Sequence, residues 1–546
     1  MKKILLTLTI AGLLVAGCTE DFLEQFPTTQ IDESAAFSTP ENAMAVLYGV
    51  YDACFQTTLT GSWMMIFNEV RGDDCFVPQQ LNWNFWNHPF NYQQIPTSTF
   101  RGAPRDWWND LYEVIENTNG AINAELPLVG EAKDAYLGEM KFMRAYAYFH
   151  LVQIFCFPYG KDNGESPGVP VYEVSDVSQM TGRGKVKDVY DLIERDLTDA
   201  IAGLPALGKA SGATRISKAF ANTVMARVKM AKLDYDGALP YINAALADAP
   251  DILTDAATLN EYKTGLNRQT KESIFNVPFN PDDYGIYWGF SNFFDHPEGY
   301  GNVFVTSALL NEYAPDDIRR EWYITPLFWN LGDDDITDYF GAYKSYLYHF
   351  EGWHVYSFAE ATALYDDGTV LDNSLFYPNR PASDLFVRPG IHSLYGKFPR
   401  VDGVRGGSFG SVGLDQPTLA RTSELWLMKA ECEARKGTPS WTAAQDALFV
   451  IQERAIPGAV KSTNTGNALI DEIMMERRKE LVGEGFRFLD ILRLGLPLAR
   501  PDIPGPNWSP IMNLPAYDNK MIYPIPEAEF DANPFMDKAT DQNPGY

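Results

Sequence analysis

Aromatic and amide side chains gather in two polar stretches of the 546-residue chain, where they could bind a carbohydrate. Sugar rings present apolar C–H faces that pack on flat aromatic rings, and hydroxyl groups that hydrogen-bond to amides and carboxylates. Neither stretch keeps a helical period, so we expect both in surface loops with their tryptophans partly exposed. A tryptophan taken singly is more often a core residue. The candidates are Trp83, Asn84, Trp86, Tyr287, Trp288 and Asn292.

Arg71 and Asp73 precede the first of these stretches and are further polar candidates for the same site. A guanidinium and a carboxylate at the edge of a loop could hydrogen-bond to sugar hydroxyl groups. The same two side chains could equally cap a helix or form a salt bridge. Both interpretations remain open at the level of the sequence.

Glu480 and Glu484 lie four residues apart, which places both carboxylates on one face of a helix. Glycoside hydrolases use such a pair, one member of which is a proton donor with a raised pKa. Nearby arginines have the opposite effect, because they hold a carboxylate in its ionised form. We therefore interpret the two glutamates as part of a structural ion-pair network. The arginines close to them in sequence are Arg477, Arg478, Arg487 and Arg493.

Other patterns typical of catalysis or metal binding are incomplete. The segment 406–410 matches G-x-S-x-G, but glycines flank it and no histidine follows His392 to complete a Ser, Asp, His order. The acidic run 333–335 lacks the spaced ligands of a calcium loop, and neither H-E-x-x-H nor C-x-x-C occurs. We predict no catalytic residue, no metal site and no cofactor. We expect four cysteines to be small buried side chains: Cys54, Cys75, Cys156 and Cys432.

The first eighteen residues have the pattern of a bacterial lipoprotein signal. Lys2 and Lys3 precede an apolar run that is too short to span a bilayer, and small residues lead to Cys18. We predict a signal peptide at 1–17, lipid attached to Cys18, and a short tether at 18–38. Several acyl chains would anchor the protein durably, whereas one chain alone holds weakly. The alternative is an ordinary signal peptide that happens to end in cysteine.

The charge of the chain excludes some partners. Its 44 Lys and Arg against 72 Asp and Glu give a formal net charge of −28. Such an acidic body repels nucleic acid and anionic lipid head groups, so neither is an expected partner. Beyond the signal we find no stretch of about twenty apolar residues that could span a membrane.

Most of the chain that positions these residues should be helical. Thr39 and Pro40 predict a helix start, because threonine caps helices and proline suits their first position. Further helices are expected at 107–126, 131–155 and 186–204. Two close pairs, 217–233 with 236–247 and 423–436 with 441–454, have the short turns and small residues of tetratricopeptide-like units.

We divide the body into a helical N-terminal region, 39–252, and a C-terminal region, 253–546. Helical periodicity fails at about 61–105 and again at 253–419, where aromatic residues stand among Gly, Asn and Asp. Loops of this length are uncommon in a compact domain and are usually functional. The chain ends in a proline-rich, loop-like segment from about residue 497.

Motifs in the same order along nearly the whole chain resemble the SusD/RagB family of bacterial surface lipoproteins. Two positions depart from the family pattern, namely Pro158, where a glycine is usual, and Ile491, where a leucine is usual. The motifs include Phe37-Ser38-Thr39-Pro40-Glu41-Asn42-Ala43, Arg144-Ala145-Tyr146-Ala147-Tyr148-Phe149, Tyr190-Asp191-Leu192-Ile193-Glu194-Arg195, Glu476-Arg477-Arg478-Lys479-Glu480-Leu481 and Tyr523-Pro524-Ile525-Pro526.

The resemblance implies a mostly α-helical fold with tetratricopeptide-like helix pairs and an irregular, loop-rich face that binds glycans. It implies a protein without enzymatic activity that is anchored in the outer membrane and exposed at the cell surface. Its partner would be a SusC-like, TonB-dependent outer-membrane barrel that receives the oligosaccharide or polysaccharide. The alternative is a helical-repeat scaffold or a peptide-binding lipoprotein of a nutrient-uptake complex.

Overall fold

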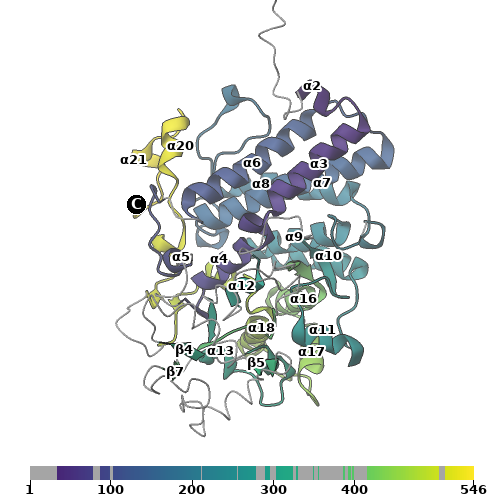
Figure 1. Ribbon diagram of the computed structural model, residues 1–546, viewed down its shortest axis with the longest axis vertical. Coiled ribbons are helices and arrows are strands. Elements are labelled where there is room, and N and C mark those ends of the chain that lie inside the picture. The colour runs from purple at the N-terminus through teal and green to yellow at the C-terminus, as the bar shows by residue number, and fades with distance from the viewer. Residues whose placement is uncertain are drawn as a thin grey trace, which may run out of the picture.

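The chain is mostly helical in the computed structural model, as the sequence predicts (Figure 1). Cys18, the predicted signal peptide and most of the predicted tether lie outside the described residues. The structure describes residues 33–77, 86–98, 102–210, 212–254, 256–277, 289–294, 303–323, 391–394, 396–398, 415–502 and 511–546, with short strands at 327–329, 348–349, 354–355 and 385–387.

Four long helices of the N-terminal region lie side by side at the top of the molecule (Figure 1). The predicted start of the first is confirmed, because Thr39 Oγ1 accepts a hydrogen bond of 3.2 Å from the Asn42 N–H and Pro40 follows the cap. The other three predicted helices are confirmed with shifts of a few residues at their ends. The four helices are α3 Pro40–Phe55, α6 Pro104–Asn123, α7 Gly130–Phe155 and α8 Val186–Gly203.

The two predicted helix pairs are both present and continue this layer. Ser217 Oγ caps the first pair by accepting a hydrogen bond of 3.3 Å from the Phe220 N–H. Ala219 and Ala226 are fully buried there, where small side chains let neighbouring helices approach. Helix α8 contacts α9, and α10 contacts α16, so each unit packs on the one before it. The pairs are α9 Lys218–Ala231 with α10 Tyr235–Asp248, and α16 Thr422–Arg435 with α17 Trp441–Ala455.

The stretch at 61–105, expected to be loop, contains a helix that its sequence pattern hides. Helix α4 Trp63–Arg71 has all nine of its residues buried. Its nine residues make only about two and a half turns, too few for a helical period to stand out from the surrounding sequence. The expectation of a loop was therefore wrong for this helix and for the short α5 Asn87–Phe90.

Short antiparallel strands tie the irregular segments to this helical body. One sheet orders its strands β1-β3-β8, with Cys75 opposite Val305 and Val305 opposite His392. The strands are β1 Cys75–Phe76, β3 Phe304–Thr306 and β8 Ile391–His392, and the pairs β2 Ser273–Asn276 with β9 Thr418–Arg421, β4 Leu327–Trp329 with β7 Leu385–Val387, β5 Tyr348–His349 with β6 His354–Val355, and β10 Leu498–Ala499 with β11 Asn513–Leu514.

The main hydrophobic core runs from α3 through the N-terminal helices to the strands, with smaller cores around α16 to α18 and around α19. Among the described helices, none is long and apolar enough to cross a membrane. The remaining α-helices are α2 Glu33–Ala36, α11 Ala256–Thr264, α12 Ser291–Phe294, α13 Ser307–Leu310, α18 Gly466–Leu481, α19 Arg487–Arg493, α20 Glu527–Ala532 and α21 Lys538–Asp541.

Candidate functional site

A buried aromatic cluster lies where the two aromatic stretches border the described structure. The rings of Trp63 on α4 and Trp86 are 5.1 Å apart between centroids and meet edge to face. Both contact Phe293 on α12, at 6.0 and 5.2 Å. Such edge-to-face pairs are preferred by aromatic rings and add to the energy of burial. The cluster therefore joins α4, the residue before α5, and α12 into one packed unit.

Described residues border the two segments that carry the predicted platforms, and one of them, Trp86, belongs to this cluster. Val77, which follows β1, and Trp86 bound the segment 78–85, and both are buried. Val277 and Gly289 bound the segment 278–288, and Val277 donates a backbone hydrogen bond of 3.0 Å to the carbonyl of Pro417. The four predicted site residues within these segments lie outside the described residues. They are Trp83, Asn84, Tyr287 and Trp288.

Trp86 is buried, although the sequence predicts partial exposure: only 1% of its surface is accessible. Its Nε1 has no hydrogen-bond acceptor among the described residues, and its ring packs on Trp63 and Phe293. The prediction of an exposed ring was wrong because Trp86 precedes α5 and lies on the main core. An Asn-rich sequence context does not by itself keep an aromatic ring at the surface.

Asn292 is also buried, on the short helix α12, with 3% of its surface accessible. Its neighbour Ser291 donates two hydrogen bonds to Asp415 Oδ2, 2.8 Å from the backbone N–H and 2.6 Å from Oγ. Asp415 Oδ1 in turn accepts a hydrogen bond of 2.7 Å from Asn267 Nδ2. These buried bonds hold the chain that follows the second aromatic stretch against the chain that leads into β9.

Arg71 is part of the protein interior. It is fully buried, with its guanidinium carbon 4.1 Å from the Phe488 ring centroid, 4.7 Å from that of Phe67 and 5.2 Å from that of Tyr523. Nη2 donates a hydrogen bond of 2.5 Å to the carbonyl of Met521. Burial lowers the pKa of Arg71. These contacts join α4 to α19 and to the C-terminal segment, and they leave Arg71 inaccessible to a ligand.

Asp73 forms the salt bridge that the sequence left open as an alternative to ligand binding. Its carboxylate accepts hydrogen bonds of 2.6 and 2.7 Å from Arg487 at the start of α19. Burial raises the pKa of Asp73, but the hydrogen bonds and charge of Arg487 outweigh burial, so the pKa is lowered. Only 7% of the Asp73 surface is accessible, so its carboxylate is committed to this pair.

Glu480 and Glu484 lie in a buried ion-pair network, as predicted, but with partners that the sequence did not indicate. Glu480 Oε1 lies 2.7 Å from Arg421 Nη1 and 2.6 Å from Arg454 Nη2. Glu484 Oε1 lies 2.7 Å from both Arg421 Nη2 and Lys397 Nζ. Burial raises the pKa of each glutamate, but these cations outweigh it and lower both pKa values. A carboxylate in this state does not donate a proton at neutral pH.

The arginines close in sequence pair elsewhere. Arg477 and Arg493 bind Asp490, while Arg478 and Arg487 bind the aspartates after α4. The expected partnership of these four arginines with Glu480 and Glu484 was therefore wrong. Arg319, Arg421, Arg454 and Lys397 carry no local signal for the role, because they come from separate elements that only the fold brings together.

Four cysteines are buried free thiols, as predicted: Cys54, Cys75, Cys156 and Cys432. Burial raises the pKa of Cys156 to about 11, so its thiol stays protonated and unreactive at neutral pH. Within the described residues, no group of three or more His, Cys, Asp or Glu side chains could hold a metal ion.

Comparison with known proteins defines the class of protein to which this fold and cluster belong. A family model described as "SusD family" matches residues 271–546. A second, described as "Starch-binding associating with outer membrane", matches residues 21–230. The chain belongs to the SusD family, whose members include carbohydrate-binding proteins.

Relatives cover the chain over its full length. SusD-like protein P25 of Formosa agariphila is 22% identical and covers 98% of this chain and 98% of its own length. SusD-like protein P2 of the same bacterium is 25% identical and covers 100% of both.

Solved structures share the fold. A SusD superfamily protein of Bacteroides thetaiotaomicron has a TM-score of 0.70 at 21% identity, covering 93% of this chain and 100% of its own. A protein described as a laminarin-binding SusD-like protein has a TM-score of 0.64 at 20% identity, with the same coverage.

Proposed function

We propose that this chain is a surface-exposed lipoprotein that binds an oligosaccharide or polysaccharide and delivers it to a SusC-like, TonB-dependent barrel in the outer membrane. One observation carries the binding part of the proposal. Trp86 and Phe293, which follow the two aromatic stretches, contact each other in one buried cluster. Segments anchored on a common rigid base can present their side chains to one ligand.

The described residues suggest different roles for the candidates. Trp83, Asn84, Tyr287 and Trp288 are the proposed sugar contacts, two aromatic platforms with amide and hydroxyl partners. Buried candidates cannot touch a ligand, so we assign them to positioning. Trp86 and Asn292 lie close to the borders of the two segments, and Arg71 with Asp73 fixes the end of α4, which precedes the first segment in the chain.

Loss of one aromatic platform should weaken glycan binding by roughly 5- to 150-fold, or about 1–3 kcal/mol, by analogy with bases stacked on aromatic side chains. We expect this for Trp83→Ala and for Trp288→Ala. Laminarin is the first probe, because a protein of this fold is described as laminarin-binding, and starch oligosaccharides are the second. Isothermal calorimetry of the full-length protein gives the affinity for whichever probe binds.

Trp441→Ala on α17 is the matched control, since this half-buried tryptophan packs against the core of α16 to α18 and should leave glycan affinity unchanged. Melting temperatures should hardly move for Trp83→Ala and Trp288→Ala. Unchanged affinity in both platform variants, measured with a glycan that the wild type binds, would contradict the proposed site.

The proposed protein binds glycans without cleaving them. Prolonged incubation with the bound polysaccharide should leave its chain length unchanged in product chromatography. Glu480 and Glu484 have the spacing of a hydrolase pair in the sequence. In the structure both side chains are buried and ion-paired with Arg421, so a substrate cannot reach them. Reproducible shortening of the glycan that disappears in Glu480→Gln would contradict this part of the proposal.

Cys18→Ala should abolish lipid attachment, because no other residue of the predicted signal can form the thioether. The variant should leave the detergent phase in phase partitioning and lose surface labelling on intact cells. Cys54→Ala is the control, since this thiol is buried in the body of the protein and should not affect lipid attachment. A Cys18→Ala protein that still carries lipid at the surface would rule out the lipoprotein signal.

A helical-repeat scaffold or a peptide-binding lipoprotein of a nutrient-uptake complex is the alternative, favoured by the series of packed helix pairs from α6 to α17. Parallel screening of glycans and peptides separates the two functions. Delivery is tested separately, because cells that lack the partner barrel should still bind the glycan but fail to take it up.

A further inference from the structure

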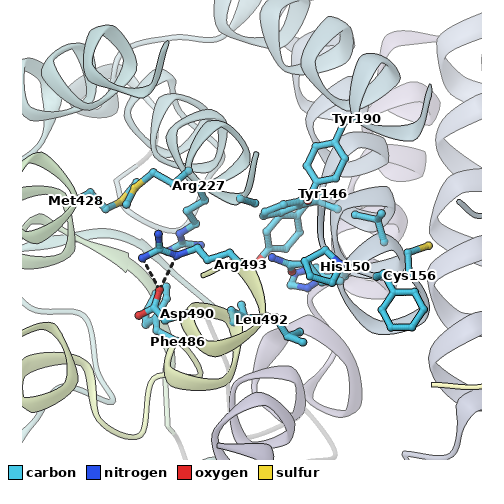
Figure 2. Close-up of a pocket in the computed structure, with 18 of the residues that line it drawn as sticks. Tyr146, His150, Cys156, Tyr190, Arg227, Met428, Phe486, Asp490, Leu492 and Arg493 are labelled. Atoms are coloured by element: carbon cyan, nitrogen blue, oxygen red, sulfur yellow. Dashed lines mark hydrogen bonds and ion pairs between the residues drawn. The ribbon is translucent and has the colours of Figure 1, made fainter. Parts of the chain in front are cut away.

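A pocket distant in sequence from the aromatic stretches lies between the two halves of the chain. Residues of α7 and α9 from the N-terminal half line it together with residues of α16 and α19 from the C-terminal half (Figure 2). Its volume is about 90 Å³. The wall is mostly apolar and aromatic, with Tyr146, Phe149, Val152, Met230, Phe486 and Leu492 among its residues.

Two buried side chains that line this pocket have hydrogen-bonding atoms without a partner among the described residues. His150 has 8% of its surface accessible, and neither of its ring nitrogens has a hydrogen-bond partner among the described residues. Arg477 has 5% accessible, and its Nη1 lacks an acceptor there too. Buried polar groups are nearly always hydrogen-bonded, so each such group calls for a partner. Both side chains line the same pocket, and His150 projects toward it from α7 (Figure 2).

The charged groups around the pocket are already paired. Arg227 binds Glu424 at 2.6 and 2.8 Å, and Arg493 binds Glu431 at 2.6 and 2.8 Å. Asp490 accepts from Arg477 Nε at 2.8 Å and from Arg493 Nε at 2.9 Å. An anionic ligand would therefore find no unpaired cation, and a cationic ligand would find no free carboxylate.

His150 is neutral in this setting. Burial and, to a smaller extent, the positive charge of Arg227 together lower its pKa to about 3. A neutral imidazole offers one donor and one acceptor. A ligand hydroxyl group can therefore donate to the unprotonated ring nitrogen while its oxygen accepts from Arg477 Nη1.

We propose that this pocket binds a small neutral molecule with an aromatic or aliphatic body and one hydroxyl or carbonyl oxygen, which hydrogen-bonds to His150 and Arg477. The apolar walls enclose the body of the ligand, and the unused polar atoms hold its oxygen. Because the lining residues come from both halves of the chain, the bound molecule stabilises the joint between them. This site is independent of the proposed glycan site.

Phenol is the probe, with benzene and benzoate as comparisons of similar shape. Phenol should bind the full-length protein saturably and raise its melting temperature by about 1–3 °C at concentrations well above the dissociation constant. Benzene lacks the oxygen and benzoate adds a charge, so both should bind more weakly. In crystals soaked with 4-bromophenol, the anomalous signal of bromine should lie between α7 and α19.

Variants at position 150 test the role of the histidine. His150→Leu should weaken phenol binding about fivefold, as expected for the loss of one hydrogen bond. His150→Gln retains a donor and an acceptor and should keep most of the affinity. Leu496→Ala, at an exposed position after α19 that does not line the pocket, should bind as the wild type does.

Three outcomes would overturn the proposal. Absence of bromine from the pocket, together with no phenol-dependent shift in melting temperature, would mean that the pocket holds only water. Tighter binding of benzoate than of phenol would exclude a neutral ligand. Equal phenol affinity in the His150→Leu protein and the wild type would contradict the assigned role of His150. If that variant fails to fold, the presence or absence of bromine density in soaked wild-type crystals shows whether the pocket binds a phenol.

Discussion

Replacing Glu480 with glutamine is expected to lower the free energy of unfolding by about 3–5 kcal/mol, because it removes one partner from a fully buried set of ion pairs. Glu480 contacts Arg421, Arg454 and Arg319 at 2.6–3.1 Å, and all four side chains have at most 1% of their surface accessible. A neutral amide leaves these guanidinium groups with less compensating charge in the interior. Guanidinium chloride unfolding followed by circular dichroism measures the change.

The effect of pH on this variant follows from the lowered pKa of Glu480. A carboxyl group whose pKa is lower in the folded than in the unfolded chain stabilises the fold above its unfolded value, about 4.3. That contribution is lost as the pH falls through the folded pKa. The difference in stability between wild type and Glu480→Gln should therefore be full at pH 6–8 and should narrow below about pH 4.

Asp446→Asn is the matched control for Glu480→Gln, because it makes the same change in an exposed pair. Asp446 lies 2.6 Å from Lys461, and both side chains are about half exposed. Surface pairs contribute about 0–1 kcal/mol, so the control should unfold close to the wild type. Equal unfolding midpoints for Glu480→Gln and the wild type would show that the network does not stabilise the fold.

Trp86→Ala is expected to destabilise the protein by about 3–5 kcal/mol, the usual cost of truncating a buried tryptophan. Trp86 is 1% exposed and packs edge to face on Trp63 and Phe293, so its removal leaves a cavity in the cluster. Since the cluster also holds the borders of both aromatic stretches, glycan affinity should fall as well. Denaturant unfolding and calorimetry on the same preparation measure both effects.

Trp83→Ala and Trp86→Phe make this result specific. The proposed platform variant Trp83→Ala should lose affinity while its unfolding midpoint stays near that of the wild type. Trp86→Phe keeps an aromatic ring in the cluster and should recover most of the stability. If Trp86→Ala unfolds like the wild type, the cluster is not the rigid base that we infer.

Much of the helical architecture could be predicted from the sequence, because its signals are local. Thr39 and Ser217 cap their helices through hydrogen bonds to residues three positions along the chain, and the small alanines of α9 mark a close helix pair. Capping and periodicity act within about one turn of helix, so adjacent residues suffice to reveal them. Helix α4 was missed because its nine residues are too few to display a helical period and no side chain caps its start.

The candidate site was predictable only in part, since residue type indicates chemistry but not exposure. Trp86 and Arg71 have the right chemistry for a glycan site, yet both are buried, one against two aromatic rings and the other among four. Burial depends on which distant segments pack against a residue. The sequence around Trp86 does not indicate its contact with Phe293, which lies more than two hundred positions away.

By itself the sequence determined the helix starts, the helix pairs, the acidic charge and the ordered motifs that place this chain in the SusD family. Only the tertiary structure decided which cations neutralise Glu480, since Arg421 and Arg319 lie 59 and 161 residues away along the chain. It alone decided that His150 and Arg477 line one pocket. The reason is physical: caps and helical periods depend on neighbouring residues, whereas ion pairing and burial depend on distances that arise only when the chain has folded.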